Sequence, residues 1–428
     1  MKKIGIGIIG LGNIGSRLYK EILSKKKDIG LKTNTDIKIV AISAKNINKK
    51  RNFKFKRKIF FKNPLEISKN PKVNIVVELI GKSDGISKSV VENALKNKKH
   101  VITANKALIS KHGDYLTSIA EKSRVNLEFE ASVGGGIPVL RTIKEGLATN
   151  KITKVYGILN GTCNYILSEM ESSQDSFKNV LKKAQLLGYA EPGNPKLDLN
   201  GYDAMAKIRI LSSLAFNKKI SKSKVLMEGI EGIETKDIDI ANQLNLRIKL
   251  LGITELINNK LFERVHPCLV KKDTFIANVN GVMNAVVLNG LPVGESVLQG
   301  EGAGPGPTSS ALMSDLLSIL RGNIKFPFGI PSNKRKKIFP YDKNSNLNSL
   351  YLRLEVKDKP GVLSQITKQL AKYKISIARL IQIPDHKRKK ASIIIITHKA
   401  KELNSANCLK SFKFNKNVLK FPTLIRLL

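Results

Sequence analysis

The sequence has no tryptophan, only three cysteines and no apolar run long enough to span a membrane. Cys163, Cys268 and Cys408 cannot form a disulfide framework, and none belongs to a C-x-x-C pair of the kind that binds zinc. A membrane-spanning helix needs about 18 consecutive apolar residues. The apolar stretch after Lys3 is interrupted by glycines and precedes no small-residue cleavage site, so it does not fit a signal peptide. We expect a cytoplasmic protein with reduced cysteines and no membrane partner.

Acidic residues are also few, 34 against 75 basic ones, which gives a net charge of +41. Such a charge raises the possibility of a nucleic-acid-binding protein, which needs basic residues gathered on one face. The basic residues here are 61 lysines and 14 arginines, spread over the whole chain. Arginine is the better residue for bidentate phosphate and base contacts. We therefore favour a general lysine bias and expect no specific nucleic-acid partner. Binding that survives about 200 mM salt would support the alternative.

The 428 residues, 42% of them apolar, are enough for two to four domains. Over residues 1–130, short runs rich in Ile and Val alternate with amphipathic helical segments. This alternation predicts a Rossmann-type, doubly wound parallel sheet that forms a dinucleotide-binding domain.

The rest of the chain divides into a second domain, a returning helix, a linker and a C-terminal module. Residues 131–308 predict a mixed α/β domain for catalysis and dimerisation, with short strands and helices over 225–291. A helix over 309–322 is expected to pack back on the first domain, and the basic, polar stretch 323–348 is typical of a linker. The tail, 349–428, has the order βαββαβ, with its last strand over 418–424, which indicates a ferredoxin-like module.

A glycine-rich motif follows the first predicted strand, with five candidate cofactor-binding residues: Gly10, Gly12, Asn13, Ile14 and Gly15. Gly12 lets a pyrophosphate approach the backbone, and Gly15 allows close packing of helix on strand. The helix that begins here presents free N–H groups and a positive dipole to the phosphates. The motif therefore predicts a dinucleotide site.

The end of the second strand carries no carboxylate to bind the adenosine ribose. Ser43 and Lys45 lie there instead, followed by three more basic residues, Lys49, Lys50 and Arg51. These groups suit a 2′-phosphate, so we predict a preference for NADP over NAD.

Asp203 and Lys207 are four residues apart and share one face of a predicted helix. Glu191 and Asp198 lie in the loop before it, and Lys106 follows a strand at the expected carboxyl edge of the sheet. Three carboxylates and a lysine suit an ammonium-bearing substrate and a proton donor. A capped helix with one surface salt bridge, worth about 0.3–0.5 kcal/mol, explains the same residues equally well.

The chain resembles the homoserine dehydrogenase family, in its single-activity form with a C-terminal ACT module. The most specific match is Gly157–Leu167, GILNGTCNYIL. The resemblance covers nearly the whole chain. Its supporting matches are Thr103–Lys106, Glu128–Pro138, Gly188–Lys207, Gly300–Asp315 and, for the ACT module, Val356–Leu363. Glu191 and Asp198 are seven residues apart, where the family usually has six.

The resemblance implies reversible NAD(P)H-dependent reduction of L-aspartate 4-semialdehyde to L-homoserine, in threonine and methionine biosynthesis. It implies that Lys207 donates the proton, that Lys106 contacts cofactor and substrate, and that Asp203, with Glu191 and Asp198, surrounds the substrate ammonium and the lysine. The substrate carboxylate is expected near Gly161 and Thr162, and the nicotinamide beneath a loop that contains Gly304.

The resemblance also implies a Na⁺ or K⁺ site at four residues, Glu130, Val133, Gly135 and Ile137. In the ACT module it implies an amino-acid effector, with threonine as the obvious candidate, near Asp358 and Gly361. A homodimer or homotetramer is expected.

Two other enzyme classes fit parts of the sequence less well. Cys163 as a nucleophile would indicate an acylating aldehyde dehydrogenase, but no histidine lies in a motif that could activate it. A structural thiol is the better interpretation. Another NADP-dependent reductase of small amino-acid intermediates is disfavoured by the motif around Asn160.

Overall fold

The computed structural model describes residues 1–49, 51, 53–193, 195–322, 324–385 and 389–428; Lys50, one of the predicted phosphate ligands, lies outside them. The N-terminal domain is built on five parallel strands in the order β2-β1-β3-β4-β5. Their bounds are β1 Lys2–Ile9, β2 Thr35–Ser43, β3 Ile75–Glu78, β4 His100–Thr103 and β5 Leu127–Glu128. The predicted doubly wound sheet is confirmed, and its strand order reverses between β1 and β3.

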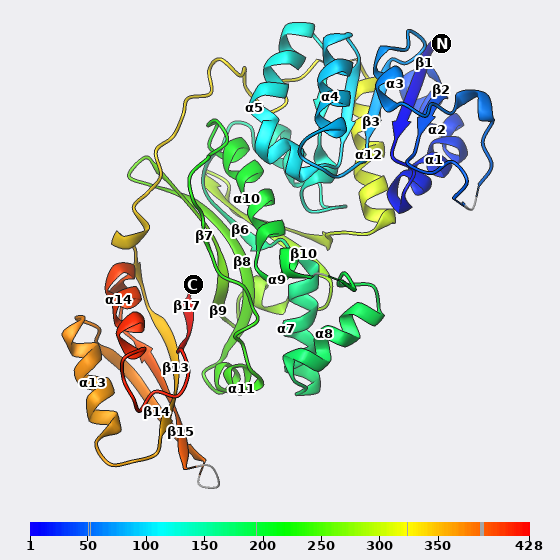
Figure 1. The fold of residues 1–428 in the computed structure, drawn as a ribbon. Helices are drawn as coiled ribbons and strands as arrows, with labels where there is room; N and C mark the ends of the chain where they lie inside the picture. The colour runs from blue at the N-terminus through cyan, green and yellow to red at the C-terminus, as the bar shows by residue number, and fades with distance from the viewer. Residues whose placement is uncertain (50, 52, 194, 323, 386–388) are drawn as a thin grey trace.

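Helices cover both faces of this sheet (Figure 1). One face carries α1 Asn13–Ser24, α2 Lys26–Thr33 and α12 Pro305–Leu320; the other carries α3 Pro64–Lys69, α4 Ile86–Lys96 and α5 Lys106–Ser123. Helix α12 packs against α1, and its Leu312, Leu316 and Ile319 belong to the buried cluster that α1 shares, although α12 follows the catalytic domain in the chain. The chain therefore returns to the first domain after it has formed the catalytic domain. No helix in the described ranges is long and apolar enough to cross a bilayer.

The second domain has a mostly antiparallel sheet with helices packed on it. Its strands are β6 Lys151–Ile158, β7 Leu226–Met227, β8 Leu246–Ile257, β9 Lys260–Lys271, β10 Met283–Leu291 and β11 Gly294–Glu301. Its helices are α6 Val139–Arg141, α7 Gly161–Ser173, α8 Phe177–Leu186, α9 Lys196–Leu199, α10 Tyr202–Ala215 and α11 Thr235–Gln243.

Strands β8 and β9 are longer than the short strands predicted for this region, at 12 residues each. They form one hairpin, whose turn residues Asn258 and Asn259 have φ angles of 49° and 60°. Asparagine tolerates the left-handed conformation, and a two-residue turn of this kind matches the twist of the paired strands. The Asn-Asn pair therefore joins two long strands in a region where short strands were predicted.

The C-terminal module has the predicted βαββαβ order: β13 Leu350–Lys357, α13 Val362–Lys372, β14 Ile377–Asp385, β15 Lys390–Thr397, α14 Glu402–Phe412 and β17 Thr423–Leu427. Two short strands, β12 Leu347–Asn348 and β16 Ala400–Lys401, pair beside it. The last strand, β17, lies later in the chain than the predicted strand over 418–424. Its residues pair with β13 on one side and with β9 on the other, which sets where the strand begins and ends. One ten-stranded sheet thus runs from the catalytic domain into the module.

A buried ion pair fixes this junction. Arg353 on β13 contacts Asp237 on α11 at 2.6 Å between Nε and Oδ1, and both side chains are fully buried. The Tyr351 hydroxyl donates to the same carboxylate oxygen at 2.7 Å. Removing Asp237 would leave the buried Arg353 charge with only Glu234 and Glu355 as partners, at 3.2 Å each.

We predict that Asp237→Ala lowers the free energy of unfolding by about 3–5 kcal/mol, measured by urea denaturation. The matched control is Asp239→Ala, an exposed carboxylate on the same helix. Equal stability of the two variants would show that the pair does not hold the module in place.

Candidate active site

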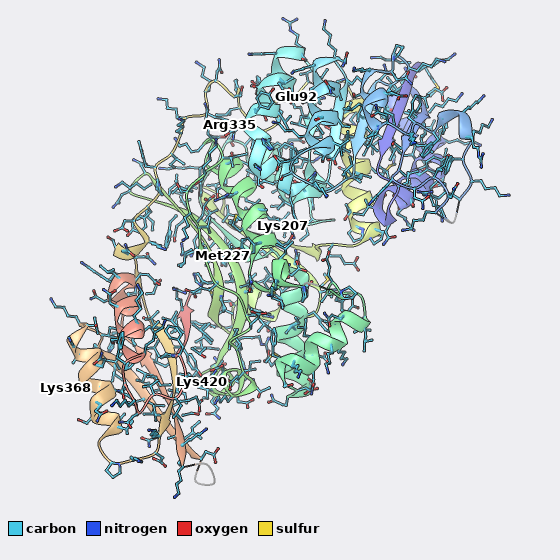
Figure 2. The ribbon with its side chains drawn as sticks, viewed as in Figure 1. Glu92, Lys207, Met227, Arg335, Lys368 and Lys420 are labelled. Carbon is cyan, nitrogen blue, oxygen red and sulfur yellow. The ribbon has the colours of Figure 1, made fainter. Side chains whose placement is uncertain are left out.

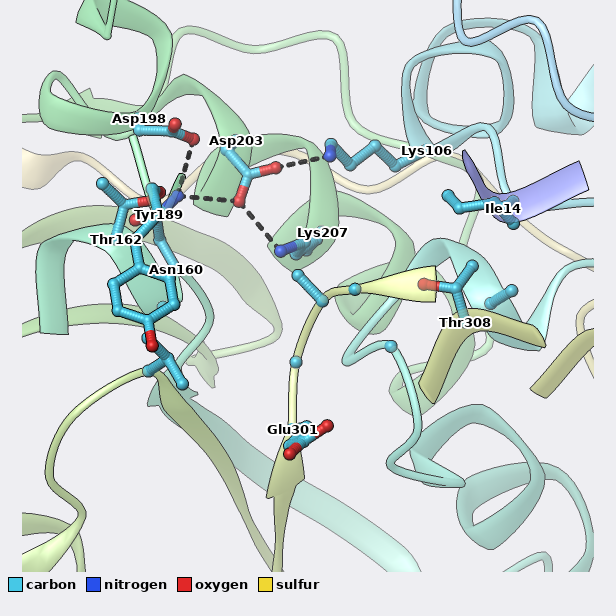
Figure 3. A pocket seen from close by; sticks show the side chains of 18 of the residues that line it. Ile14, Lys106, Asn160, Thr162, Tyr189, Asp198, Asp203, Lys207, Glu301 and Thr308 are labelled. Carbon is cyan, nitrogen blue, oxygen red and sulfur yellow. Dashed lines mark hydrogen bonds and ion pairs between the residues drawn. The ribbon is translucent and has the colours of Figure 1, made fainter. Parts of the chain in front are cut away.

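A cavity of about 610 Å³ lies between the N-terminal domain and the catalytic domain (Figure 3). The first domain contributes Ile14, Ala104 and Lys106, which follow strands β1 and β4. In open α/β sheets, ligands bind beyond the carboxyl ends of the strands. The catalytic domain closes the cavity with Asn160, Gly161, Thr162, Tyr189, Asp198, Asp203 and Lys207.

The glycine-rich turn has the geometry that a phosphate needs. A Cβ on Gly15 would lie 1.9 Å from the Gly10 carbonyl oxygen, so a larger residue would separate helix from strand. Within the described chain, nothing comes within 4 Å of a Cβ placed on Gly12, and no side chain there caps α1, which begins at Asn13. The first N–H groups of α1 are thus available to an anion.

A second, basic hollow of about 340 Å³ lies beside this turn. Its lining includes Gly12 and Asn13 together with four cations, Arg17, Lys20, Lys49 and Arg51. Arg51 donates to the Leu11 carbonyl at 3.4 Å from Nε, and its other nitrogens donate to carbonyls of the loop before it. Of the residues predicted here, Ser43 is buried with its carbonyl bound to the Gly10 N–H, and Lys45 is exposed; neither lines the hollow.

Asp203 is the centre of the catalytic end of the cavity (Figure 3). Its Oδ1 lies 2.6 Å from the Lys106 Nζ, and its Oδ2 lies 2.8 Å from the Lys207 Nζ. Lys207 also donates to the Leu159 carbonyl oxygen at 2.6 Å and is buried, whereas the Lys106 side chain is 42% exposed. Helices α5 and α10, from different domains, therefore meet through one carboxylate.

The charges of this cluster shift one another's pKa. Burial opposes ionisation of Asp203, but Lys207 and Lys106 outweigh burial and lower its pKa. Burial lowers the pKa of Lys207, and the neighbouring Lys106 charge adds to this effect, while Asp203 resists it. For Lys106 the carboxylates outweigh burial, so its pKa is raised. Lys207 is thus the more acidic of the two ammonium groups.

Of the three predicted carboxylates, two line the cavity and one does not. Asp198 lines the cavity, and burial, with the charge of Asp203, raises its pKa. Glu191 is exposed and does not line the cavity; its main-chain carbonyl accepts a hydrogen bond from the Gln185 Nε2 at 3.1 Å. The structure brings Asp198, Asp203, Lys106 and Lys207 together and leaves Glu191 outside.

The start of α7 forms another wall. Gly161 and Thr162 line the cavity, and the Thr162 hydroxyl donates to the Tyr189 carbonyl at 2.6 Å. Cys163 is fully buried, and burial raises the pKa of its thiol well above the usual value. A buried thiol with a raised pKa is a poor nucleophile, which agrees with the structural role expected for it.

The loop after β11 closes the remaining side. Gly304 and Thr308 line the cavity beside Ile14, and Gly304 precedes α12 with a φ of 108°. The main chain of Gly302 lies against Gly135, where a Cβ would approach the Gly302 carbonyl to 2.5 Å.

The four predicted cation ligands lie on one turn beside this loop. Both Glu130 carboxylate oxygens accept main-chain N–H groups, from Leu140 and Arg141, at 2.8 Å each. The Ile137 carbonyl accepts the Val139 N–H at 2.8 Å. Val133 and Gly135 lie between them, with Gly135 at the cavity wall.

The two predicted effector residues lie in the turn between β13 and α13. The Asp358 N–H donates to the Lys389 carbonyl at 3.1 Å, and Gly361 has a φ of 83° before the first residue of α13.

Comparison with known proteins identifies the family. Three family models match: "Homoserine dehydrogenase, NAD binding domain" over residues 10–130, "Homoserine dehydrogenase" over 138–317 and "ACT domain" over 350–409. The chain belongs to the homoserine dehydrogenase family.

Homoserine dehydrogenases of Neisseria gonorrhoeae and Helicobacter pylori are 39% and 37% identical to it, and each alignment covers 100% of this chain and 99% of the relative. The crystal structure of a homoserine dehydrogenase from Thiobacillus denitrificans has a TM-score of 0.90 at 35% identity, covering 100% of this chain and 99% of that one. The family consists of NAD(P)-dependent oxidoreductases, which confirms the predicted enzyme class.

Sequence reasoning did not assign a role to Asn160 or Tyr189, although both line the cavity. Asn160 precedes α7 and accepts the Cys163 N–H, as an N-cap asparagine does. That capping pattern was the available signal, but it predicts a helix start rather than a place in the site.

We predict that Asp203→Asn lowers the pKa of the Lys207 ammonium further, because it removes the negative charge that resists the effect of burial. NMR titration of ¹⁵N-labelled lysines would measure the shift, with Lys207→Ala used to assign the signal. Asp84→Asn, which removes the exposed partner of Lys111, is the control and leaves the Lys207 titration unchanged. A Lys207 signal that titrates alike in wild type and Asp203→Asn would contradict this account.

Proposed function

We propose that this chain catalyses the reversible NADPH-dependent reduction of L-aspartate 4-semialdehyde to L-homoserine, with Lys207 as the proton donor. Membership of the homoserine dehydrogenase family supports the reaction. The observation that supports the role of Lys207 is its burial at the cavity wall, with its ammonium held by Asp203 and its pKa lowered.

The substrate is a zwitterion, and the cavity offers groups for both of its charges. Asp198, beside Asp203, binds the ammonium, since a carboxylate in a partly buried site attracts a cation strongly. The N–H groups of Gly161 and Thr162, at the start of α7, bind the carboxylate. This arrangement directs the aldehyde toward the two lysines.

Lys207 moves the proton. In the reductive direction its Nζ gives a proton to the aldehyde oxygen, on which negative charge develops, and in the oxidative direction the neutral amine takes a proton from the homoserine hydroxyl. Lys106, still positively charged, stabilises the developing oxyanion. Asp203 keeps both amines oriented toward the cavity.

The coenzyme, when bound, supplies the hydride that reaches the carbonyl carbon. The glycine turn and α1 would hold its pyrophosphate, and the loop with Gly304 would contact its nicotinamide end. The basic hollow, rather than Ser43 or Lys45, holds the 2′-phosphate, through Arg51 and Lys49. A hyperthermophilic archaeal homoserine dehydrogenase mutant of the same fold, 22% identical with a TM-score of 0.62, has been solved in complex with NADPH.

Two further ligands remain proposals. A monovalent cation is held by the main-chain carbonyls of Glu130, Val133, Gly135 and Ile137; the Glu130 carboxylate takes no part, because both of its oxygens bind main-chain N–H groups. Neutral carbonyl oxygens suit such a hard ion. An amino acid, with threonine the first candidate, binds the ACT module near Asp358 and Gly361, where no side chain of the described residues caps the start of α13.

Lys207→Ala is predicted to lower kcat for homoserine oxidation by about 10²–10⁴-fold, the usual contribution of a positioned acid–base group. The assay follows NADP reduction in a spectrophotometer. Lys368→Ala is the control, because this exposed lysine lies on α13, far from Lys207 (Figure 2). Full activity of Lys207→Ala would exclude the proposed role.

Arg51→Ala is predicted to lower kcat/KM for NADP by about 10–100-fold, which corresponds to losing a charged hydrogen bond worth about 1.5–3 kcal/mol. The kcat/KM for NAD should change by less than about threefold, because NAD has no 2′-phosphate. Lys27→Ala, an exposed lysine on α2, leaves both values unchanged. Equal losses with the two coenzymes would mean that Arg51 only supports the loop, and a wild-type preference for NAD would contradict the proposed NADP preference.

A further inference from the structure

Asn160 stands between the two cavity carboxylates, and its own orientation is fixed. It is the N-cap of α7: its Oδ1 accepts the Cys163 N–H at 2.8 Å. The side chain is buried at 5% exposure. Because the oxygen of the amide is committed to the helix, the nitrogen must point the opposite way, into the cavity.

Both hydrogens of that nitrogen have partners. Nδ2 donates to Asp198 Oδ1 at 2.8 Å and to Asp203 Oδ2 at 3.0 Å (Figure 3). The second acceptor is the same oxygen that contacts the Lys207 Nζ. Asn160 therefore joins the carboxylate beside the amines to the carboxylate on the substrate side of the cavity.

We propose that Asn160 is a positioning residue for the reaction: its amide holds Asp203 against Lys207 and holds Asp198 apart for the substrate ammonium. The inference rests on the roles proposed above for Lys207 and Asp198. The neighbouring carboxylates of Asp198 and Asp203 repel one another. A hydrogen-bond donor between them offsets this repulsion without adding a charge. Without it, Asp203 keeps its two lysine contacts but loses the donor that fixes the orientation of its carboxylate, and Asp198 loses the hydrogen bond that Asn160 donates to its Oδ1.

The residue type fits this task closely. An aspartate at 160 would cap α7 equally well but would place a third negative charge between the other two. A serine would also cap the helix, yet it is too short to reach both carboxylates. Only an amide caps the helix with one end and donates two hydrogen bonds with the other.

The experiment compares Asn160→Asp and Asn160→Ser with wild type, because both variants keep a capping oxygen. For Asn160→Ser we expect a loss of about 10–100-fold in kcat/KM for homoserine, with kcat lowered and KM raised. For Asn160→Asp we expect at least that loss, together with a shift of the kcat–pH profile for homoserine oxidation to higher pH. The added carboxylate favours the protonated Lys207, so the neutral amine forms later.

Two controls separate positioning from capping. Asn63→Asp and Asn63→Ser change the N-cap of α3, where Asn63 Oδ1 accepts the Leu65 N–H at 3.1 Å, and these variants should leave the kinetics unchanged. Urea denaturation of the Asn160 and Asn63 variants checks that each remains folded under the assay conditions. An unchanged pH profile in Asn160→Asp, or wild-type kcat and KM in Asn160→Ser, would overturn the inference. If Asn160→Asp does not fold, Asn160→Ser alone decides by its kcat and KM.

Lys207→Ala distinguishes this inference from the proposed function. If Lys207→Ala is inactive and the Asn160 variants have the kcat and KM of the wild type, only the positioning role is overturned. A fully active Lys207→Ala overturns the proposed role of Lys207 and this inference with it.

Discussion

One carboxylate, Asp203, determines what the site can do. Two ammonium groups from different domains contact its two oxygens, at 2.6 and 2.8 Å. Without that charge, the buried Lys207 would lose the group that keeps its ammonium stable and oriented. With it, a lysine of lowered pKa remains charged and faces the cavity. The chemistry therefore depends on one ion-pair cluster at the boundary between the two domains.

The rest of the fold brings the two halves of that cluster together. Lys106 comes from the N-terminal domain and Asp203 from the catalytic domain, so the distance between their side chains depends on how the two domains are joined. Helix α12 returns to the first domain, and its buried Asp315 accepts the Glu130 N–H at 3.0 Å. Nearby, Lys144 contacts Glu128 at 3.0 Å at the end of β5. These buried polar contacts fix the crossing between domains, while β17 fixes the ACT module on the other side.

The positions of the three charged residues in this cluster follow from the sequence, because local patterns determine them. The spacing of Asp203 and Lys207 places them on one helix face, and the position of Lys106 after a strand places it at the ligand-binding edge of the sheet. The remainder depends on contacts between distant segments. The bond from Asn160 to Asp198 spans a loop whose path no periodicity predicts, and the same loop leaves Glu191 exposed. The pairing of β17 with β9 depends on which sheet edge is free, and a single strand pattern does not contain that information.

The pH dependence of both reaction directions in the wild-type enzyme tests the central claim most directly. If Lys207 carries the proton, aldehyde reduction falls and homoserine oxidation rises through the same pKa, and burial places that pKa below the usual 10.5 of lysine. Two directions that change in the same sense with pH, or that share no titrating group, would contradict the account.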